Sequence, residues 1–248
     1  MQRLSLQPVL RIRTLPLAAA LVAVFLPAAM SQPAGSGTAS AGKAARIELR
    51  LERMMNGEWK DVDPATVFQQ GERLRFRFRA SFNGYLYVMN RGTSGAYELL
   101  FPRQDTGSAN RVDAGKTYIV PATQGGSFKV TGPPGYDIMH WMVTPVELGQ
   151  GPGKHGFVPL PAAPWGELPK SMTPRCDDDI WRARGECIDS DAGARGLDES
   201  GALPENLKNL PHAQSRELLF IQKDKTAVVS SPGGLTAPVI YEFRLAHK

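Results

Sequence analysis

From residue 46 onward, apolar and polar residues alternate along the chain with a period of two. Ile47, Leu49 and Leu51 alternate with charged residues, and the same alternation returns over 73–79. A period of two places successive side chains on opposite faces of a β-strand, so that one face is buried and the other is solvated. No amphipathic pattern of helical period extends over three turns. Both segments are therefore predicted to be strands.

Further short strands are predicted between turn signals. Pro102 ends one of them because proline donates no hydrogen bond to a sheet. Many short strands with frequent turns are typical of sandwiches and barrels. We predict an all-β fold, an immunoglobulin-like antiparallel β-sandwich, with 46–148 as the main domain and 216–248 as C-terminal strands that complete it. The additional strands are expected at 85–89, 96–101, 117–120, 127–131, 138–144, 218–222, 226–229 and 239–245.

A long irregular segment, rich in proline and glycine, is predicted at 149–215, before the last strands. Eleven of the 26 residues in 149–174 are Gly or Pro, a composition that cannot form a central strand. The stretch 177–199 then carries eight acidic residues. Oxygen-rich loops can hold calcium, but the EF-hand spacing is absent, which favours a solvated or salt-bridged loop.

The N-terminus has the three parts of a secretory signal peptide, predicted to span 1–31. Arg3, Arg11 and Arg13 precede an apolar stretch over 15–29, and small residues follow it. Cleavage after Ser31 or after residue 34 is consistent with the pattern, and an uncleaved anchor is the alternative. A flexible Gly/Ser/Ala-rich linker is expected over 32–45. The mature protein is predicted to be extracytoplasmic, periplasmic or secreted, with no transmembrane segment after signal removal, because no later apolar run approaches about 20 residues.

Charge argues against a nucleic-acid partner. The formal net charge of +5 comes from 29 basic and 24 acidic residues. Removal of the three leader arginines leaves 26 basic residues, a balance of +2. A nucleic-acid-binding domain usually carries a much stronger basic excess.

The two cysteines are predicted to form a disulfide, Cys176–Cys187. They are the only pair in the chain, and an oxidising compartment allows a disulfide to persist. Free thiols, or a zinc site completed by neighbouring acidic residues at 177–179, are the alternatives.

Four arginines occupy alternate positions of the strand predicted at 73–79, and we call them the arginine row: Arg73, Arg75, Arg77 and Arg79. Such a row suits an anionic polymer such as a charged glycan, through forked hydrogen bonds. The plainer interpretation, which we favour, is the solvated face of an antiparallel strand. Cross-strand pairing with carboxylates is a third possibility, with Glu48, Glu52 and Glu98 as candidates. The acidic stretch 177–199 is a further hypothetical partner of the row.

Three segments in order, GERLRF at 71–76, GYLYVMN at 84–90 and LLFP at 99–102, carry a resemblance to a known family. Together with Ala114-Gly115 and Pro134-Gly135, they resemble the bacterial domain of unknown function 4384 over about residues 59–148. The resemblance implies a β-rich module of the kind often joined to kinase, peptidase or repeat regions in envelope and signalling proteins. It implies no catalytic residues.

No catalytic residue, cofactor or metal site is predicted. The chain has no Gly-x-Ser-x-Gly elbow, phosphate loop, His-Glu-x-x-His or dinucleotide fingerprint. His140 lies in an apolar strand, where a structural role is expected. We predict a non-catalytic module that binds or assembles with a cell-envelope protein or glycan, with the arginine row as a weak candidate site. The alternatives are an extracytoplasmic hydrolase using carboxylates such as Asp177 and Asp179, and a regulator of a separately encoded envelope or signalling protein.

Overall fold

The computed structural model describes residues 44–149, 173–196, 218–231, 233, 235 and 238–248. The predicted signal peptide and almost all of the predicted linker lie outside the described residues. The same holds for much of the predicted irregular segment, at 150–172 and 197–215. Among the described residues, no helix has the length and apolar character that crossing a membrane requires.

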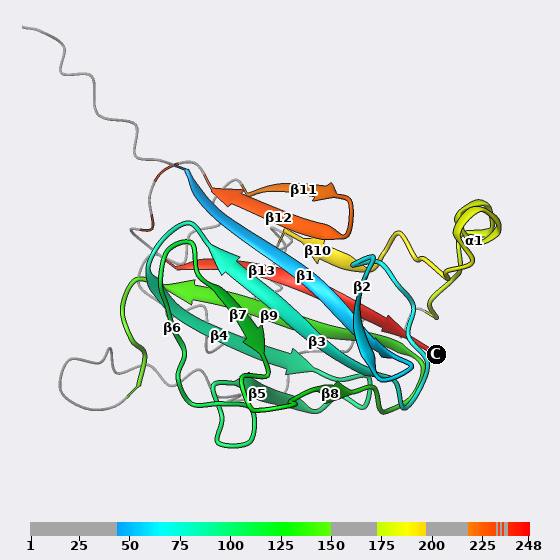
Figure 1. Ribbon diagram of the computed structural model, residues 1–248, viewed down its shortest axis with the longest axis horizontal. Helices are drawn as coiled ribbons and strands as arrows, with labels where there is room; N and C mark the ends of the chain where they lie inside the picture. The colour runs from blue at the N-terminus through cyan, green and yellow to red at the C-terminus, as the bar shows by residue number, and fades with distance from the viewer. Residues whose placement is uncertain (1–43, 150–172, 197–217, 232, 234, 236–237) are drawn as a thin grey trace, which may run out of the picture. The chain divides into compact units, whose positions relative to one another are not determined.

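The first sheet has seven strands, in the order β11-β12-β1-β3-β7 (Figure 1). β2 also pairs with β1, and β8 also pairs with β3. All of these pairings are antiparallel. The strands are β1 (Ala45–Met55), β2 (Glu58–Val62), β3 (Arg73–Ala80), β7 (Thr117–Val120), β8 (Phe128–Lys129), β11 (Leu219–Lys223) and β12 (Thr226–Ser231).

The second sheet has six strands, in the order β10-β13-β9-β4-β5, with β6 paired to β4. These pairings are also antiparallel. The C-terminal strands thus extend both sheets, since β12 pairs with β1 and β13 pairs with β9. The strands are β4 (Gly84–Arg91), β5 (Tyr97–Phe101), β6 (Arg111–Val112), β9 (Gly135–Thr144), β10 (Gly193–Arg195) and β13 (Val239–His247).

The core lies between the two sheets and is built by the residues that the period-two pattern places inward. Phe76 and Phe78 of β3 face Trp141 of β9, with ring centroids 5.0 Å and 5.9 Å from the indole. Phe243 of β13 meets Phe76 edge to face at 5.5 Å. These rings are fully buried, so their apolar area is a main source of stability. The packing of two antiparallel sheets confirms the predicted all-β sandwich.

Part of the segment predicted to be irregular has regular structure. It contains the seven-residue helix α1 (Asp178–Arg184) and strand β10, which pairs with β13. Asp177 caps α1 by accepting hydrogen bonds from the amides of residues 179 and 180, each at 3.0 Å. No residue of α1 is buried, so the helix leaves no amphipathic pattern in the sequence.

The predicted disulfide between Cys176 and Cys187 is present, with the two Cα atoms 4.8 Å apart. It closes the loop that contains α1. Cys187 packs in a small buried cluster with Ala65, Val67 and Ile188, and this cluster fixes the base of the loop. A cross-link of this loop length contributes about 3 kcal/mol in the chain-entropy account.

Candidate functional site

Two arginines at the centre of the row, Arg75 and Arg77, share one buried carboxylate. Glu52 of β1 lies opposite Arg75 of β3 in the antiparallel register. Its Oε2 is 2.5 Å from Nε of Arg75, and its Oε1 is 3.1 Å from Nε of Arg77. The Glu52 side chain is only 3% exposed. The Arg75 guanidinium also lies 4.4 Å from the ring centroid of Trp59, in a cation–π arrangement. These two arginines are therefore structural.

Arg79 is also engaged within the sheet. Its Nη1 lies 4.0 Å from Oε2 of Glu48, and its Nε donates a 3.0 Å hydrogen bond to the carbonyl oxygen of Gly115. Two of the three proposed carboxylate partners thus pair with the row, whereas Glu98 pairs with Arg103. The cross-strand interpretation describes this end of β3 better than a purely solvated face.

The acidic stretch has other partners among the described residues. Asp189 is buried and accepts hydrogen bonds from the hydroxyl of Tyr136 at 2.7 Å and from the amide of Arg175 at 2.5 Å. Asp191 forms an ion pair with Arg195 at 2.9 Å. Burial, together with the hydrogen bond to Asp189, raises the pKa of Tyr136. In the described part of 177–199, which excludes Asp198 and Glu199, no carboxylate forms an ion pair with the arginine row, so these residues give the proposed docking no support.

Arg73, at the start of β3, has different neighbours. Its Nε donates to Oγ of Ser127 at 2.8 Å, and its Nη2 lies 3.5 Å from the carbonyl oxygen of Gly125. Its cross-strand neighbour on β8 is Lys129. Like charges directly opposite each other in a sheet destabilise it. Within the residues that the structure describes, no carboxylate forms an ion pair with Arg73 or Lys129.

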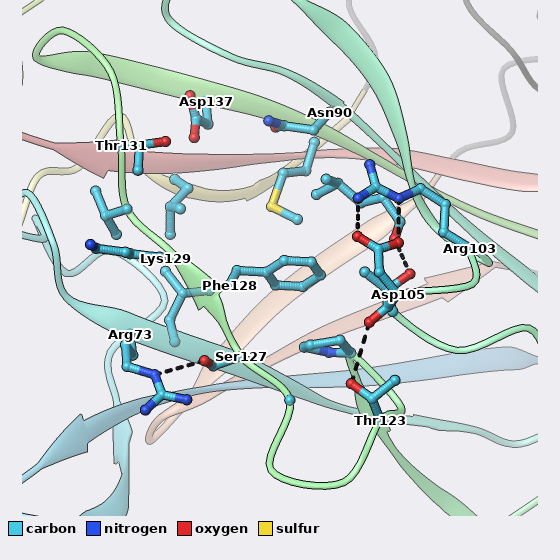
Figure 2. Close-up of a pocket in the computed structure, with 18 of the residues that line it drawn as sticks. Arg73, Asn90, Arg103, Asp105, Thr123, Ser127, Phe128, Lys129, Thr131 and Asp137 are labelled. Carbon is cyan, nitrogen blue, oxygen red and sulfur yellow. Dashed lines mark hydrogen bonds and ion pairs between the residues drawn. The ribbon is translucent and has the colours of Figure 1, made fainter.

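A cleft of about 490 Å³ opens beside these two cations, between the β8 end of the first sheet and strands β4, β5 and β9 of the second. Its floor is apolar, because Leu74, Val130, Met139 and Leu245 are buried core residues. Figure 2 shows Arg73 and Lys129 on one side of Phe128 and Arg103 and Asp105 on the other. The other polar residues of its lining are Asn90, Glu98, Thr106, Thr123, Ser127, Thr131 and Asp137.

At the Arg103 corner of the cleft, two carboxylates surround one guanidinium, which leaves a net negative charge. Nη1 of Arg103 lies 2.7 Å from Oε2 of Glu98, and its Nε donates to Oδ1 of Asp105 at 2.7 Å. Its Nη2 contacts Oδ2 of the same carboxylate. The hydrogen bond from Arg103 lowers the pKa of Asp105, and the same bond raises the pKa of the guanidinium. Both partners are therefore charged at neutral pH, and this corner, with two carboxylates around one guanidinium, does not attract anions.

The rim contributed by the second sheet offers hydrogen-bond acceptors. Oδ1 of Asp137 accepts the amide of Thr93 at 3.0 Å and lies 3.5 Å from Nε2 of His247. Oδ2 of Asp137 accepts no hydrogen bond from the described residues. The Oδ1 atom of Asn90 is buried and also lacks a hydrogen-bond partner there. A buried acceptor left unpaired costs free energy, so a ligand that supplies donors at this rim stabilises the site.

His140, which lies in an apolar strand of the sequence, does not line the cleft. It is fully buried on β9, with the ring of Tyr97 at 6.5 Å. Burial, and secondarily the charge of Arg91, lowers the pKa of His140 to about 4. The imidazole is therefore neutral at pH 7, as befits a structural residue. Among the described residues, no group of three or more His, Cys, Asp or Glu side chains is arranged to hold a metal ion.

The structure thus brings only one member of the predicted row, Arg73, into the cleft. Sequence reasoning missed Lys129, Asp137 and Asn90, because each becomes relevant only through strand pairing across or between the sheets. The sequence does place Lys129 in the predicted strand 127–131, but it does not indicate that this strand pairs with β3.

These features define a class of molecule: a two-sheet β-sandwich with a polar cleft between its layers. Residues 67–147 match the family model described as Domain of unknown function (DUF4384), which confirms the resemblance seen in the sequence. The matched region runs from just before β3 to just after β9 and includes most of the cleft lining. Neither the comparison with curated proteins nor the comparison with solved structures yields a match.

Proposed function

We propose that this protein is an extracytoplasmic, non-catalytic binding module that holds an anionic group of a cell-envelope partner in the cleft between its sheets. One observation carries the proposal. Arg73 and Lys129 face each other across β3 and β8, and no described carboxylate forms an ion pair with either. An anion placed between them relieves their repulsion and gains charge-assisted hydrogen bonds.

The guanidinium of Arg73 is already oriented for this task. Ser127 and Gly125 hold it from one side, which reduces the entropy lost when a ligand binds. Arginine donates in a planar fork that matches a carboxylate, a phosphate or a sulfate, whereas lysine adds a point charge. The apolar floor beneath excludes water and strengthens these contacts.

The carboxylates of the cleft are arranged as structural groups, which supports binding over hydrolysis. Arg103 holds Glu98 and Asp105, and the backbone amide of Thr93 holds one oxygen of Asp137. A catalytic acid or base must exchange a proton with the substrate, and a carboxylate held by an arginine or by a backbone amide is less free to do so. In the acidic stretch, Asp177 is occupied as the cap of α1.

The disulfide and the leader pattern support an extracytoplasmic location. The test is to isolate the protein from cell fractions and read its N-terminus by mass spectrometry. We expect an N-terminus near residue 32 in a periplasmic or secreted fraction, with Cys176 and Cys187 oxidised. A cytoplasmic pool that retains Met1 would contradict the proposal.

Calorimetric titration tests the site itself. The probes are two anionic polymers, polygalacturonate and dextran sulfate, with neutral dextran as reference. In the double variant Arg73→Gln/Lys129→Gln, we expect the affinity for both anions to fall by about tenfold or more, because each lost charge-assisted contact is substantial.

The matched control is Lys60→Gln/Arg111→Gln, which removes the same charge at exposed positions that do not line the cleft. We expect this control to change the affinity by about twofold at most. Equal losses in the two double variants would mean that binding follows net charge and would overturn the proposal. Hydrolysis of a polymer that stops in Asp179→Asn would support the hydrolase instead.

A further inference from the structure

The charges that line the cleft are balanced, and this restricts the ligand. The basic side chains Arg73, Arg103 and Lys129 stand against three acidic ones, Glu98, Asp105 and Asp137. A densely charged polyanion, such as polyphosphate, would be attracted at one end of the cleft and repelled along the rest. The cleft therefore fits a ligand that concentrates one negative charge at Arg73 and Lys129 and is neutral elsewhere.

The remainder of the ligand must supply hydrogen-bond donors. The oxygen of Asp137 that the Thr93 amide leaves open can only accept. The hydroxyls of Thr123, Ser127 and Thr131 on the neighbouring loop both donate and accept. Ligand hydroxyl groups satisfy both kinds of partner, whereas a second anionic group would be repelled by Asp137.

An aromatic surface lies between these two polar regions. The Phe128 ring is partly buried, packs 6.3 Å from the ring of Phe76, and extends into the cleft in Figure 2. A flat apolar surface between a cationic pair and a set of hydroxyl-binding groups complements a sugar ring, which has apolar C–H faces and a polar edge.

An acidic peptide fits this site less well. Extended peptides commonly bind by adding a strand to a sheet edge. At the cleft, the edge of the first sheet is β8, which has only two residues, Phe128 and Lys129. It offers too short a ladder for that mode.

We propose that the cleft binds an acidic sugar of the uronic-acid type. The sugar carboxylate lies between Arg73 and Lys129, its ring packs on Phe128, and its hydroxyls donate to Asp137. This inference rests on the proposed function, because it names the ligand class of the same cleft.

The experiment compares four probes on the full mature protein by calorimetry: a galactose oligomer that ends in one galacturonic acid (the monouronate oligomer), the neutral galactose oligomer of equal length, a polyglutamate peptide and polyphosphate. We expect the monouronate oligomer to bind about tenfold more tightly than each of the others. Saturation-transfer NMR should also show the sugar ring protons in contact with aromatic protons, and this signal should disappear in Phe128→Leu.

Two variants separate sugar recognition from simple anion binding. Asp137→Asn and Phe128→Leu should each weaken binding of the monouronate oligomer by about fivefold while leaving the affinity for inorganic sulfate, which is small enough to contact Arg73 and Lys129 alone, within about twofold. The retained affinity for sulfate shows that the variants are folded. Equal losses for the two ligands would overturn the sugar assignment.

The outcomes distinguish the inference from the proposed function. If polyglutamate or polyphosphate binds more tightly than the monouronate oligomer and depends on Arg73 and Lys129, the sugar assignment is wrong and the anion-binding cleft stands. If no anionic probe distinguishes Arg73→Gln/Lys129→Gln from the native protein, both proposals fail.

Discussion

The two ends of strand β3 carry the same side chain at the same spacing, yet they differ in their surroundings. Arg75 and Arg77 share the buried carboxylate of Glu52, which β1 places beside them. Arg73, at the other end, faces Lys129 of β8. The first arrangement satisfies the arginines within the protein, and the second leaves a cationic pair at the mouth of a cleft.

The difference comes from the partner strand. β1 lies beside most of β3 and brings Glu52 into register with Arg75 and Glu48 with Arg79. Arg77 lies opposite Arg50, which forms its own ion pair with Asp61, and Arg77 reaches the Glu52 carboxylate instead. β8 pairs only with the first two residues of β3 and brings a lysine. The contribution of a surface charge thus depends on its cross-strand neighbour, and a periodic row of arginines is not by itself a binding site.

Loss of the buried carboxylate is expected to have the largest effect. Glu52→Gln leaves Arg75 and Arg77 without their counter-charge, and breaking a buried pair by removing one partner is costly. Because the Arg77 side chain is 43% exposed and partly solvated, we expect a smaller loss than for a fully buried pair, about 2 kcal/mol in the free energy of unfolding. Urea denaturation measures it.

Glu48→Gln is the matched control at the same row. The Glu48 side chain is 29% exposed, and its contacts with Arg46 and Arg79 are longer, at 3.1 Å and 4.0 Å. A loss below about 1 kcal/mol is expected. Comparable losses in the two variants would show that Glu52 has no special role.

The net negative charge of the Arg103 corner can be removed by one substitution. Asp105→Asn takes away one of the two carboxylates around Arg103 and leaves Glu98 as its single counter-charge. Anion affinity for dextran sulfate should rise about two- to threefold at low salt and return to the native value at high salt. Acidification to pH 4.5 is no substitute, because the pKa of Asp105 is lowered below its ordinary value of 3.8 and the carboxylate stays ionised. An unchanged affinity in the variant would mean that Arg103 is inaccessible to anions.

The smallest change in stability is expected when Arg73 receives a carboxylate on its partner strand, as Arg75 already has. Lys129→Glu places a carboxylate opposite Arg73 and replaces repulsion with attraction. Stability should rise by about 0.5 kcal/mol at low salt, measured by urea denaturation, while anion binding is lost. Destabilisation by this substitution would argue that the two side chains do not interact.

The fold could be predicted from the sequence wherever burial follows a period of two. β7 occurs at the predicted residues, and β3 differs by one residue at its end. β2 was missed because its side chains are mainly polar, and it forms through the tight turn at Asn56 and Gly57, both with positive φ. α1 was missed because none of its residues is fully buried, and it is held by its cap, by the disulfide and by the packing of Ile180 on the cluster around Cys187.

The candidate site could be predicted only in part. The row directed attention to β3, and the carboxylates of Glu48 and Glu52 were recognised as possible partners. The register of β1 against β3, and of β8 against β3, decides which arginine is neutralised. The register depends on how the strands pair in the folded protein, so the local sequence pattern does not determine it. Asp137 and Asn90 come from the other sheet, so no local pattern links them to Arg73.

The most direct test of the account is an NMR titration of the arginine side-chain Nε–H signals with sodium sulfate at constant ionic strength. We predict that the Arg73 signal shifts and saturates, while the signals of Arg75 and Arg77, held by Glu52, stay in place. Equal shifts of all the arginine signals of the row, or an Arg73 signal that does not shift, would contradict the division of β3 into a structural end and a binding end.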